Sequence, residues 1–213
     1  MTKIETVPTD AGEARITWHP ARGARRVLAL ALGHGAGGGI EARDLAALAA
    51  ALPARGVTVA LVEQPWRVAG KKVAPAPKTL DTGWRGLWPA LAKPGLPVVA
   101  GGRSAGARVA CRTGAELGAA AVLALSFPLH PPGRPERSRA DELLATGLPT
   151  LVVQGGNDPF GKPAEFPPAG PYELVEIPYG DHGFAVPRRA PVDQEEAVRR
   201  IVGAVADWLA ALR

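Results

Sequence analysis

Ser104 is the residue whose type and setting most directly suggest chemistry. It stands in the segment G-R-S-A-G at 102–106, after the apolar run PVVAG at 97–101 and before a segment of small residues. On a tight strand-to-helix turn a serine is forced outward above the sheet, and flanking glycines avoid a collision of a β-carbon with neighbouring backbone. Helix entry leaves free N–H groups nearby. We therefore expect Ser104 to be a nucleophile and the N–H of Ala105 to bind the resulting oxyanion.

A base and a carboxylate must accompany this serine, because its hydroxyl is a poor nucleophile at neutral pH. The pattern G-x-S-x-G alone is common by chance in a chain with 26 glycines. Asp158 follows the apolar run at 150–155, and His182 follows the run at 172–178. The carboxyl ends of parallel strands meet at one edge of a sheet, so both loops should open beside Ser104. We predict that His182 deprotonates Ser104 and that Asp158 orients His182.

Alternatives stay open for the acid and for the histidine. Asp158 precedes Pro159 and could be a turn residue, in which case Asp181 would be the acid. We favour Asp158, because neighbours in sequence rarely point at each other and an acid on the preceding strand's loop can reach the imidazole. His182 itself could be structural. Cys111, which shares a helical face with the serine, is expected to be a small core residue and not a second nucleophile.

The glycine-rich segment GHGAGGG at 33–39 fits two different functions. Its first six residues satisfy G-x-G-x-x-G after an apolar run, and Glu63 ends the next run where a ribose-binding acid would sit in a dinucleotide site. The segment also fits the H-G-x-G-type turn that supplies a second oxyanion donor, here the N–H of Ala36. We favour the second interpretation because it joins this loop to the serine, aspartate and histidine loops in one site. Dinucleotide binding leaves those three loops unexplained.

Short apolar runs bounded by Gly and Pro predict the strands that position these residues. Most runs are apolar throughout, as in strands buried on both faces of a parallel sheet. The segment ARITW at 14–18 predicts an N-terminal edge strand. The other strands are expected at 25–32, 57–63, 97–101, 121–127, 150–155 and 172–178.

Helical segments alternate with these strands. The last one begins with Asp193 and Glu196 at capping-box spacing and continues as an apolar stripe to Leu212. This alternation predicts a single α/β domain over 1–213, with a mostly parallel, twisted sheet, helices on both faces and ligands at the carboxyl ends of the strands. The other helices are expected at 41–52, 80–92, 104–117 and 139–146.

Three Pro-rich connectors follow strands and can overhang the site. They lie at 64–79, 128–136 and 159–171. None is long enough to be a separate domain, so we expect a minimal cap or none.

Composition limits the cellular setting and the partners. The 213 residues are 46% apolar and include a single cysteine. No secretory apolar segment occurs in residues 1–25, and no run approaches the roughly 20 apolar residues of a membrane span. The formal charge of +5 is spread along the chain, which leaves nucleic-acid binding a weak alternative. We expect a cytoplasmic protein with a small-molecule substrate, no nucleic-acid or membrane partner, no cofactor, and no metal, since the four histidines lack metal-ligand spacing.

Five segments together resemble a small α/β-hydrolase family: LALGHGAGGG, EQPWRVAGKKVAPAP, GGRSAGARVA, QGGNDPFG and DHGF, within roughly residues 25–212. Relatives in that family include a noncatalytic subunit of a eukaryotic histone-acetyltransferase complex and, more distantly, dienelactone-hydrolase-like enzymes. The resemblance implies an α/β-hydrolase fold and the chain order serine, aspartate, histidine. It carries over Ser104, Asp158 and His182 as triad positions, with Ala36 and Ala105 as oxyanion donors. It implies no substrate, because dienelactone hydrolases use cysteine where this chain has serine.

These features predict a serine hydrolase that forms an acyl-enzyme from a small carboxylic ester or thioester. We expect a shallow, accessible pocket lined partly by Trp66, Trp84 and Phe160. Arg103 and Arg67 could favour a substrate with a carboxylate or phosphate, although an arginine that braces a loop is equally compatible. The alternative from another class is a hydrolase fold retained as a noncatalytic binding or scaffold protein. The oligomeric state is not predicted.

Overall fold

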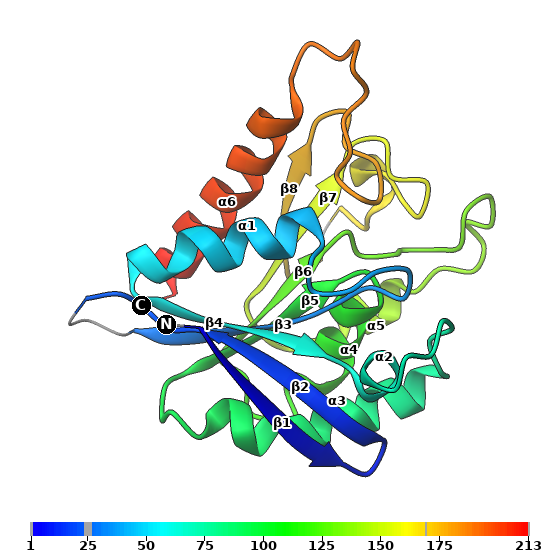
Figure 1. Cartoon of the computed structure of the whole chain (residues 1–213). Coiled ribbons are helices and arrows are strands. Elements are labelled where there is room, and N and C mark those ends of the chain that lie inside the picture. The colour runs from blue at the N-terminus through cyan, green and yellow to red at the C-terminus, as the bar shows by residue number, and fades with distance from the viewer. Residues whose placement is uncertain (1, 24–26, 169, 213) are drawn as a thin grey trace.

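An eight-stranded sheet forms the centre of the computed structural model, which describes residues 2–23, 27–168 and 170–212 (Figure 1). The strand order is β1-β2-β4-β3-β5-β6-β7-β8. Strand β2 is antiparallel to both of its neighbours, and the strands from β4 to β8 are parallel. The strands are β1 (Lys3–Thr9), β2 (Gly12–His19), β3 (Leu28–Gly33), β4 (Val57–Glu63), β5 (Val98–Arg103), β6 (Ala121–Leu125), β7 (Thr150–Gly155) and β8 (Glu173–Ile177).

Helices cover both faces of this sheet. In Figure 1, α1 and α6 lie together on one side, with α3 and α4 on the other. The helices are α1 (Arg43–Ala51), α2 (Pro65–Val68), α3 (Pro77–Ala92), α4 (Ala105–Thr113), α5 (Ala140–Leu144) and α6 (Gln194–Ala211), with 3₁₀ turns η1 (Leu52–Arg55) and η2 (Pro163–Glu165). None of the described helices is long and apolar enough to cross a membrane.

Two separate hydrophobic cores form because the central strands are apolar on both faces. Every residue of β3, β6 and β7 is buried. One core packs Leu87 of α3 and Val109 of α4 against the sheet, and the other packs Leu48 of α1 and Ile201 of α6 against the opposite face. The predicted architecture, a mostly parallel sheet with helices on both faces and a minimal cap or none, is confirmed.

The N-terminal edge of the sheet differs from the prediction. The expected edge strand at 14–18 lies within β2, which is an inner strand, and the edge is β1. No residue of β1 is fully buried, and in the sequence KIETVPT the spacing of Ile4 and Val7 gives neither an alternation nor an apolar run. Strand β1 was therefore missed because it has little apolar surface to bury. The predicted strand at 25–32 begins in residues outside the described ones, and β3 itself starts at Leu28.

Proline and capping residues set several helix ends. Helix α3 begins at Pro77, three residues before the predicted start, because proline suits the first helical turn. The connector predicted at 64–79 also contains the short helix α2. At the start of α6 the Asp193 carboxylate accepts a hydrogen bond from the N–H of Glu196 at 2.7 Å, which is half of the expected capping box.

Glycines allow α4 to approach strand β3 very closely. A β-carbon built on Gly106 would lie 2.5 Å from the Gly33 carbonyl oxygen. One on Gly102 would lie 2.7 Å from the same oxygen. Because these neighbours are backbone atoms, they cannot move aside as a flexible side chain would.

We expect Gly106→Ala to lower the free energy of unfolding by about 3 kcal/mol, since it forces the helix away from the sheet. The matched control is Gly203→Ala in the middle of α6, where a built β-carbon meets nothing within 4 Å. That control should raise stability by about 0.5 to 1 kcal/mol, because alanine is the better helix former. Urea denaturation of both variants measures the difference. Equal stabilities for the two variants would contradict this packing.

Candidate active site

The backbone at Ser104 makes a sharp turn between β5 and α4. Its φ is 53° and its ψ is −110°, which is a strained conformation for a residue with a β-carbon. The N–H of Ser104 donates to the Leu125 carbonyl at 2.9 Å and continues the pairing with β6. The turn leaves the serine partly exposed at the carboxyl ends of the strands. This is the tight turn that the flanking glycines predict.

The structure brings Ser104, His182 and Asp158 together in one hydrogen-bonded chain. The imidazole Nδ1–H of His182 donates to Asp158 Oδ2 at 2.8 Å. With Nδ1 protonated, Nε2 is left to accept the hydroxyl proton of Ser104, whose Oγ is 2.9 Å away. The Asp158 side chain is fully buried, whereas the His182 side chain is 22% exposed. The arrangement can therefore move a proton from the serine to a base that solvent and ligand can reach.

Neutral donors stabilise the buried Asp158 carboxylate. Gln154 Nε2 lies 2.9 Å from Oδ2, and the N–H of Phe160 donates to Oδ1 at 2.8 Å. Gln154 also approaches the Gly161 carbonyl at 2.9 Å, so it holds the loop that carries the acid. Sequence reasoning missed Gln154. The available signal was a polar residue inside the otherwise apolar run TLVVQG, directly before the loop.

Asp181, the alternative acid, has a different set of partners. Its Oδ1 accepts hydrogen bonds from the N–H groups of Gly183 at 2.7 Å and Ala185 at 2.8 Å. These bonds shape the loop that carries His182. The two loops also touch through backbone, because a β-carbon on Gly155 would lie 2.4 Å from the Gly180 carbonyl oxygen. Asp181 therefore supports the loop, and the imidazole faces Asp158.

The glycine-rich loop packs against the nucleophile. A β-carbon built on Gly35 would lie 3.4 Å from Ser104 Cβ, and Ala36 follows in an exposed turn. Within the described residues, the N–H groups of Ala36 and Ala105 donate to no other group. Their N–H groups remain available for the oxyanion role that we predict for them.

His34 holds this loop in place, a role that sequence reasoning missed. Its Nδ1–H donates to the Gly35 carbonyl at 2.8 Å, and its Nε2 accepts the N–H of Gln64 at 3.2 Å. Burial lowers the pKa of His34, which keeps the ring neutral and preserves the acceptor. The available signal was the histidine of the H-G-x-G turn itself.

Two observations weaken the dinucleotide alternative. Helix α1 begins only at Arg43, so the glycines do not open the helix directly. Glu63, the acid that would bind the ribose, lies 3.3 Å from Arg15 in an ion pair between the adjacent strands β4 and β2. Among the described residues, no group of three or more His, Cys, Asp or Glu side chains could hold a metal ion.

The expected pocket aromatics are found in three different places. The Phe160 ring packs on the imidazole of His182, with centroids 4.2 Å apart and the planes 30° apart. Trp66 is buried and meets the His34 ring edge-on at 5.5 Å. Trp84 is 1% exposed and lies in the core against Gly33, so its assignment to the pocket was wrong. The helical stripe of α3 that carries Trp84 faces the sheet.

The two arginines are also held by protein groups. Arg67 is exposed and lies 3.8 Å from Glu41. Arg103 is 15% exposed, pairs with the buried Asp44 and donates through Nη2 to the His182 carbonyl at 2.6 Å. The structure favours the interpretation of Arg103 as a brace over that of a substrate-binding residue.

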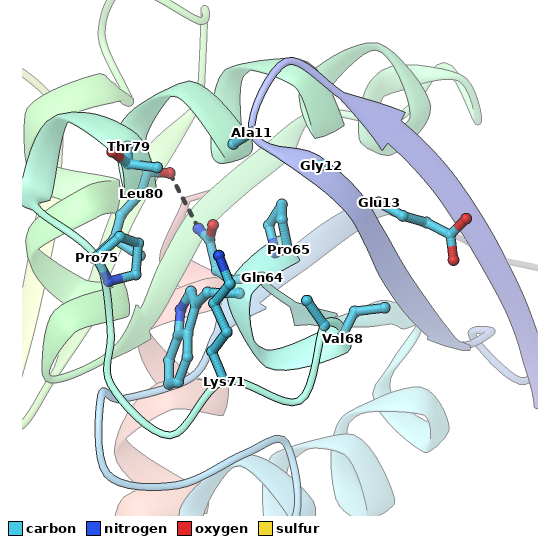
Figure 2. Close-up of a pocket in the computed structure, with 12 residues that line it drawn as sticks. Ala11, Gly12, Glu13, Gln64, Pro65, Val68, Lys71, Pro75, Thr79 and Leu80 are labelled. Atoms are coloured by element: carbon cyan, nitrogen blue, oxygen red, sulfur yellow. Dashed lines mark hydrogen bonds between the residues drawn. The ribbon is translucent and has the colours of Figure 1, made fainter.

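Two cavities adjoin on the side of the site where Ala105 lies. The larger, of about 560 Å³, lies between β2, α2 and the start of α3 (Figure 2). The smaller, of about 10 Å³, is lined by Gly35 and Ala105. Both cavities share Gln64, Trp66 and Leu80 as lining residues. Figure 2 shows the Gln64 amide bonded to the Leu80 carbonyl, at 3.3 Å, in this shared wall.

Known proteins resemble this chain in sequence and in fold. The sequence profile of the alpha/beta hydrolase domain matches residues 26–210. An alpha-beta serine hydrolase homologue from Coxiella burnetii aligns with TM-score 0.77 at 16% identity, over 96% of this chain and 98% of that chain. Dienelactone hydrolase from Anabaena variabilis aligns with TM-score 0.74 at 19% identity, over 99% and 97%.

A third solved structure, an α/β serine hydrolase without a lid from Xanthomonas campestris, aligns with TM-score 0.72 at 18% identity, over 97% of this chain and 94% of that chain. No protein with a curated description matches the chain in sequence. At these identities the structural likeness establishes the fold alone.

Cys111 provides a test of the burial around α4. Its side chain is 3% exposed, and burial raises the pKa of the thiol to about 12. Because the thiolate is the reactive form, we expect iodoacetamide at pH 8 to alkylate the native protein about 1,000-fold more slowly than the urea-unfolded chain. Mass spectrometry over time gives both rates, with Cys111→Ser as the unlabelled control. Equal rates would mean that the thiol is accessible.

Proposed function

Since this chain belongs to the alpha/beta hydrolase domain family, we propose that it is a serine hydrolase acting on a small carboxylic ester or thioester. The observation that carries the proposal is the hydrogen-bonded chain from Ser104 through His182 to Asp158, with distances of 2.9 and 2.8 Å. A strained nucleophile, a base in the correct tautomer and a buried acid are the parts that acyl transfer needs.

The first half of the reaction forms an acyl-enzyme. His182 Nε2 takes the hydroxyl proton of Ser104 while Oγ attacks the carbonyl carbon. The carbonyl oxygen becomes an oxyanion facing the N–H groups of Ala36 and Ala105. Asp158 stabilises the imidazolium that forms. The imidazolium then returns its proton to the leaving alkoxide or thiolate as the carbon–oxygen or carbon–sulfur bond breaks.

Water completes the reaction by the same steps. His182 removes a proton from a water molecule, whose oxygen attacks the acyl carbon. The second tetrahedral intermediate collapses, Ser104 Oγ recovers the proton from His182, and the carboxylic acid leaves. The partial exposure of Ser104 and His182 supports this step, because water can reach both groups without movement of a cap.

The surroundings of the serine support a small, uncharged reacting group. Arg103 is engaged by Asp44 and the His182 carbonyl, and Arg67 lies beside Glu41. Neither guanidinium is directed to a ligand by these contacts, so a preference for acidic esters has no support in the contacts of either arginine. The cavity beside Ala105 is only about 10 Å³, and the room on this side, about 560 Å³, lies in the larger cavity beyond the shared residues Gln64, Trp66 and Leu80.

We expect a fluorophosphonate probe to label the folded wild-type protein and to fail with Ser104→Ala and His182→Ala. The physical reason is that the probe reacts only with a serine whose hydroxyl is deprotonated by a neighbouring base. Gel fluorescence gives the rate, and circular dichroism verifies folding. Folded wild-type protein that is not labelled and hydrolyses no ester would instead indicate a noncatalytic binding or scaffold protein.

The same labelling measurement separates the two candidate acids. Asp158→Asn should lower the labelling rate by about 10⁴-fold, because an amide at that position disfavours the required imidazole tautomer. Asp181→Asn is the matched control. Its amide oxygen can still accept the N–H bonds of the loop, so the rate should stay within about two-fold of wild type.

A substitution at Trp66 tests whether the acyl group binds on the side of the site where the two cavities lie. Trp66→Ala should join the two cavities that share this residue, and thereby admit a longer chain. We expect kcat/KM for an octanoyl ester to rise about 10-fold relative to an acetyl ester. Val73→Ala, on the same connector at an 80% exposed position, is the control. An unchanged ratio would place the acyl group elsewhere.

A further inference from the structure

Arg103 links three parts of the site through one side chain. It ends strand β5 and directly precedes Ser104 in the chain. Its Nη2 donates to the His182 carbonyl at 2.6 Å, and its Nε lies 3.2 Å from Asp44 Oδ2 on helix α1. The nucleophile's strand, the histidine's loop and the helix that follows the glycine-rich loop therefore meet at one guanidinium.

Asp44 is a charged side chain at a position where its burial costs free energy. It is fully buried, and the contact of its Oδ2 with Arg103 Nε is an ion pair whose atoms are not aligned as a hydrogen bond. Burial raises the pKa of Asp44, and the Arg103 charge opposes that rise. A buried carboxylate is a poor way to stabilise a fold, because desolvation offsets most of the attraction. Its presence calls for a role that an apolar residue could not fill.

We propose that Asp44 and Arg103 are positioning residues that hold His182 at hydrogen-bonding distance from Ser104. The inference rests on the proposed function of the same site. The bond from Arg103 to the His182 carbonyl closes a ring that runs from Ser104 Oγ through the imidazole, the His182 backbone and the guanidinium back to the adjacent residue. The separation of base and nucleophile is then set by one side chain and not by the whole loop after β8.

The charged groups of Arg103 and Asp44 have different roles in positioning His182. The planar guanidinium can bind a carbonyl and a carboxylate at once, which an ammonium on a flexible stem does poorly. The carboxylate fixes the orientation of the guanidinium from the side of α1. It also offsets a positive charge that would otherwise oppose the formation of the imidazolium on His182 during the reaction.

Helix α4 supplies a matched ion pair with no loop attached. Arg112 lies 2.6 Å from Asp81, with side chains 19% and 11% exposed, between α4 and α3. Arg112 also lies 3.0 Å from Glu142. Arg112→Met therefore removes a partly buried arginine that touches neither Ser104 nor the histidine loop.

The experiment compares Arg103→Met, Arg103→Lys and Arg112→Met with wild type, using p-nitrophenyl acetate hydrolysis and fluorophosphonate labelling per folded molecule. For Arg103→Met we expect kcat and the labelling rate to fall about 100-fold with KM within about two-fold, as for a misplacement of roughly an ångström. Arg103→Lys should recover part of the rate, because its charge still pairs with Asp44. Arg112→Met should lose thermal stability and keep both rates.

A second readout follows the imidazole directly. The proton NMR resonance of the His182 Nδ1–H, assigned by its absence in His182→Ala, reports the bond to Asp158. It should shift or broaden in Arg103→Met and stay unchanged in Arg112→Met. If wild type neither hydrolyses the ester nor binds the probe, the proposed function fails, and this resonance alone decides the positioning role.

Three results would overturn the proposal. Folded Arg103→Met with wild-type kcat, labelling and resonance would show that the pair positions nothing. Equal rate losses in Arg103→Met and Arg112→Met would reduce the role to general stability. A rise in KM at constant kcat would mean that Arg103 contacts the substrate.

Discussion

The close contact between the backbone of α4 and the end of β3 is the constraint on which the site depends. The position that a β-carbon would take on Gly106 lies 2.5 Å from the Gly33 carbonyl oxygen, so only glycine permits the approach. That approach forces the strained turn at Ser104 and brings Gly35 of the glycine-rich loop to the side of the nucleophile. The backbone turn at Ser104 and the position of the N–H groups beside it therefore both depend on this one contact. A larger residue would disturb both together.

Support for the histidine comes from outside the three residues that form the hydrogen-bonded chain. Asp181 shapes the loop, Phe160 packs on the ring, and Arg103 holds the carbonyl of His182. Asp181 restricts the path of the backbone, Phe160 restricts the tilt of the ring, and Arg103 restricts the distance to strand β5, which precedes the nucleophile. An open site needs such restraint because no cap presses its loops into place.

The sequence pattern predicted the features of the fold that depend on the periodicity of burial and on the direction of the strands. Fully apolar runs indicated the central strands, and their parallel direction indicated that the loops of Ser104, Asp158 and His182 would meet. Side-chain direction was beyond that reasoning, so Trp84 was assigned to the pocket although its helical face turns to the core. The role of Gln154 was missed for a related reason, because its partners are assembled only when the chain folds.

Strand β1 has a consequence for the behaviour of the protein in concentrated solution. It forms one of the two edges of the sheet, where a row of unpaired backbone groups could template the addition of a foreign strand. Its sequence KIETVPT places Lys3 and Glu5 along the edge, and Pro8 lacks the N–H that such pairing requires. The polar sequence that left this strand unpredicted therefore also protects this edge of the sheet against the addition of strands from other molecules and against aggregation.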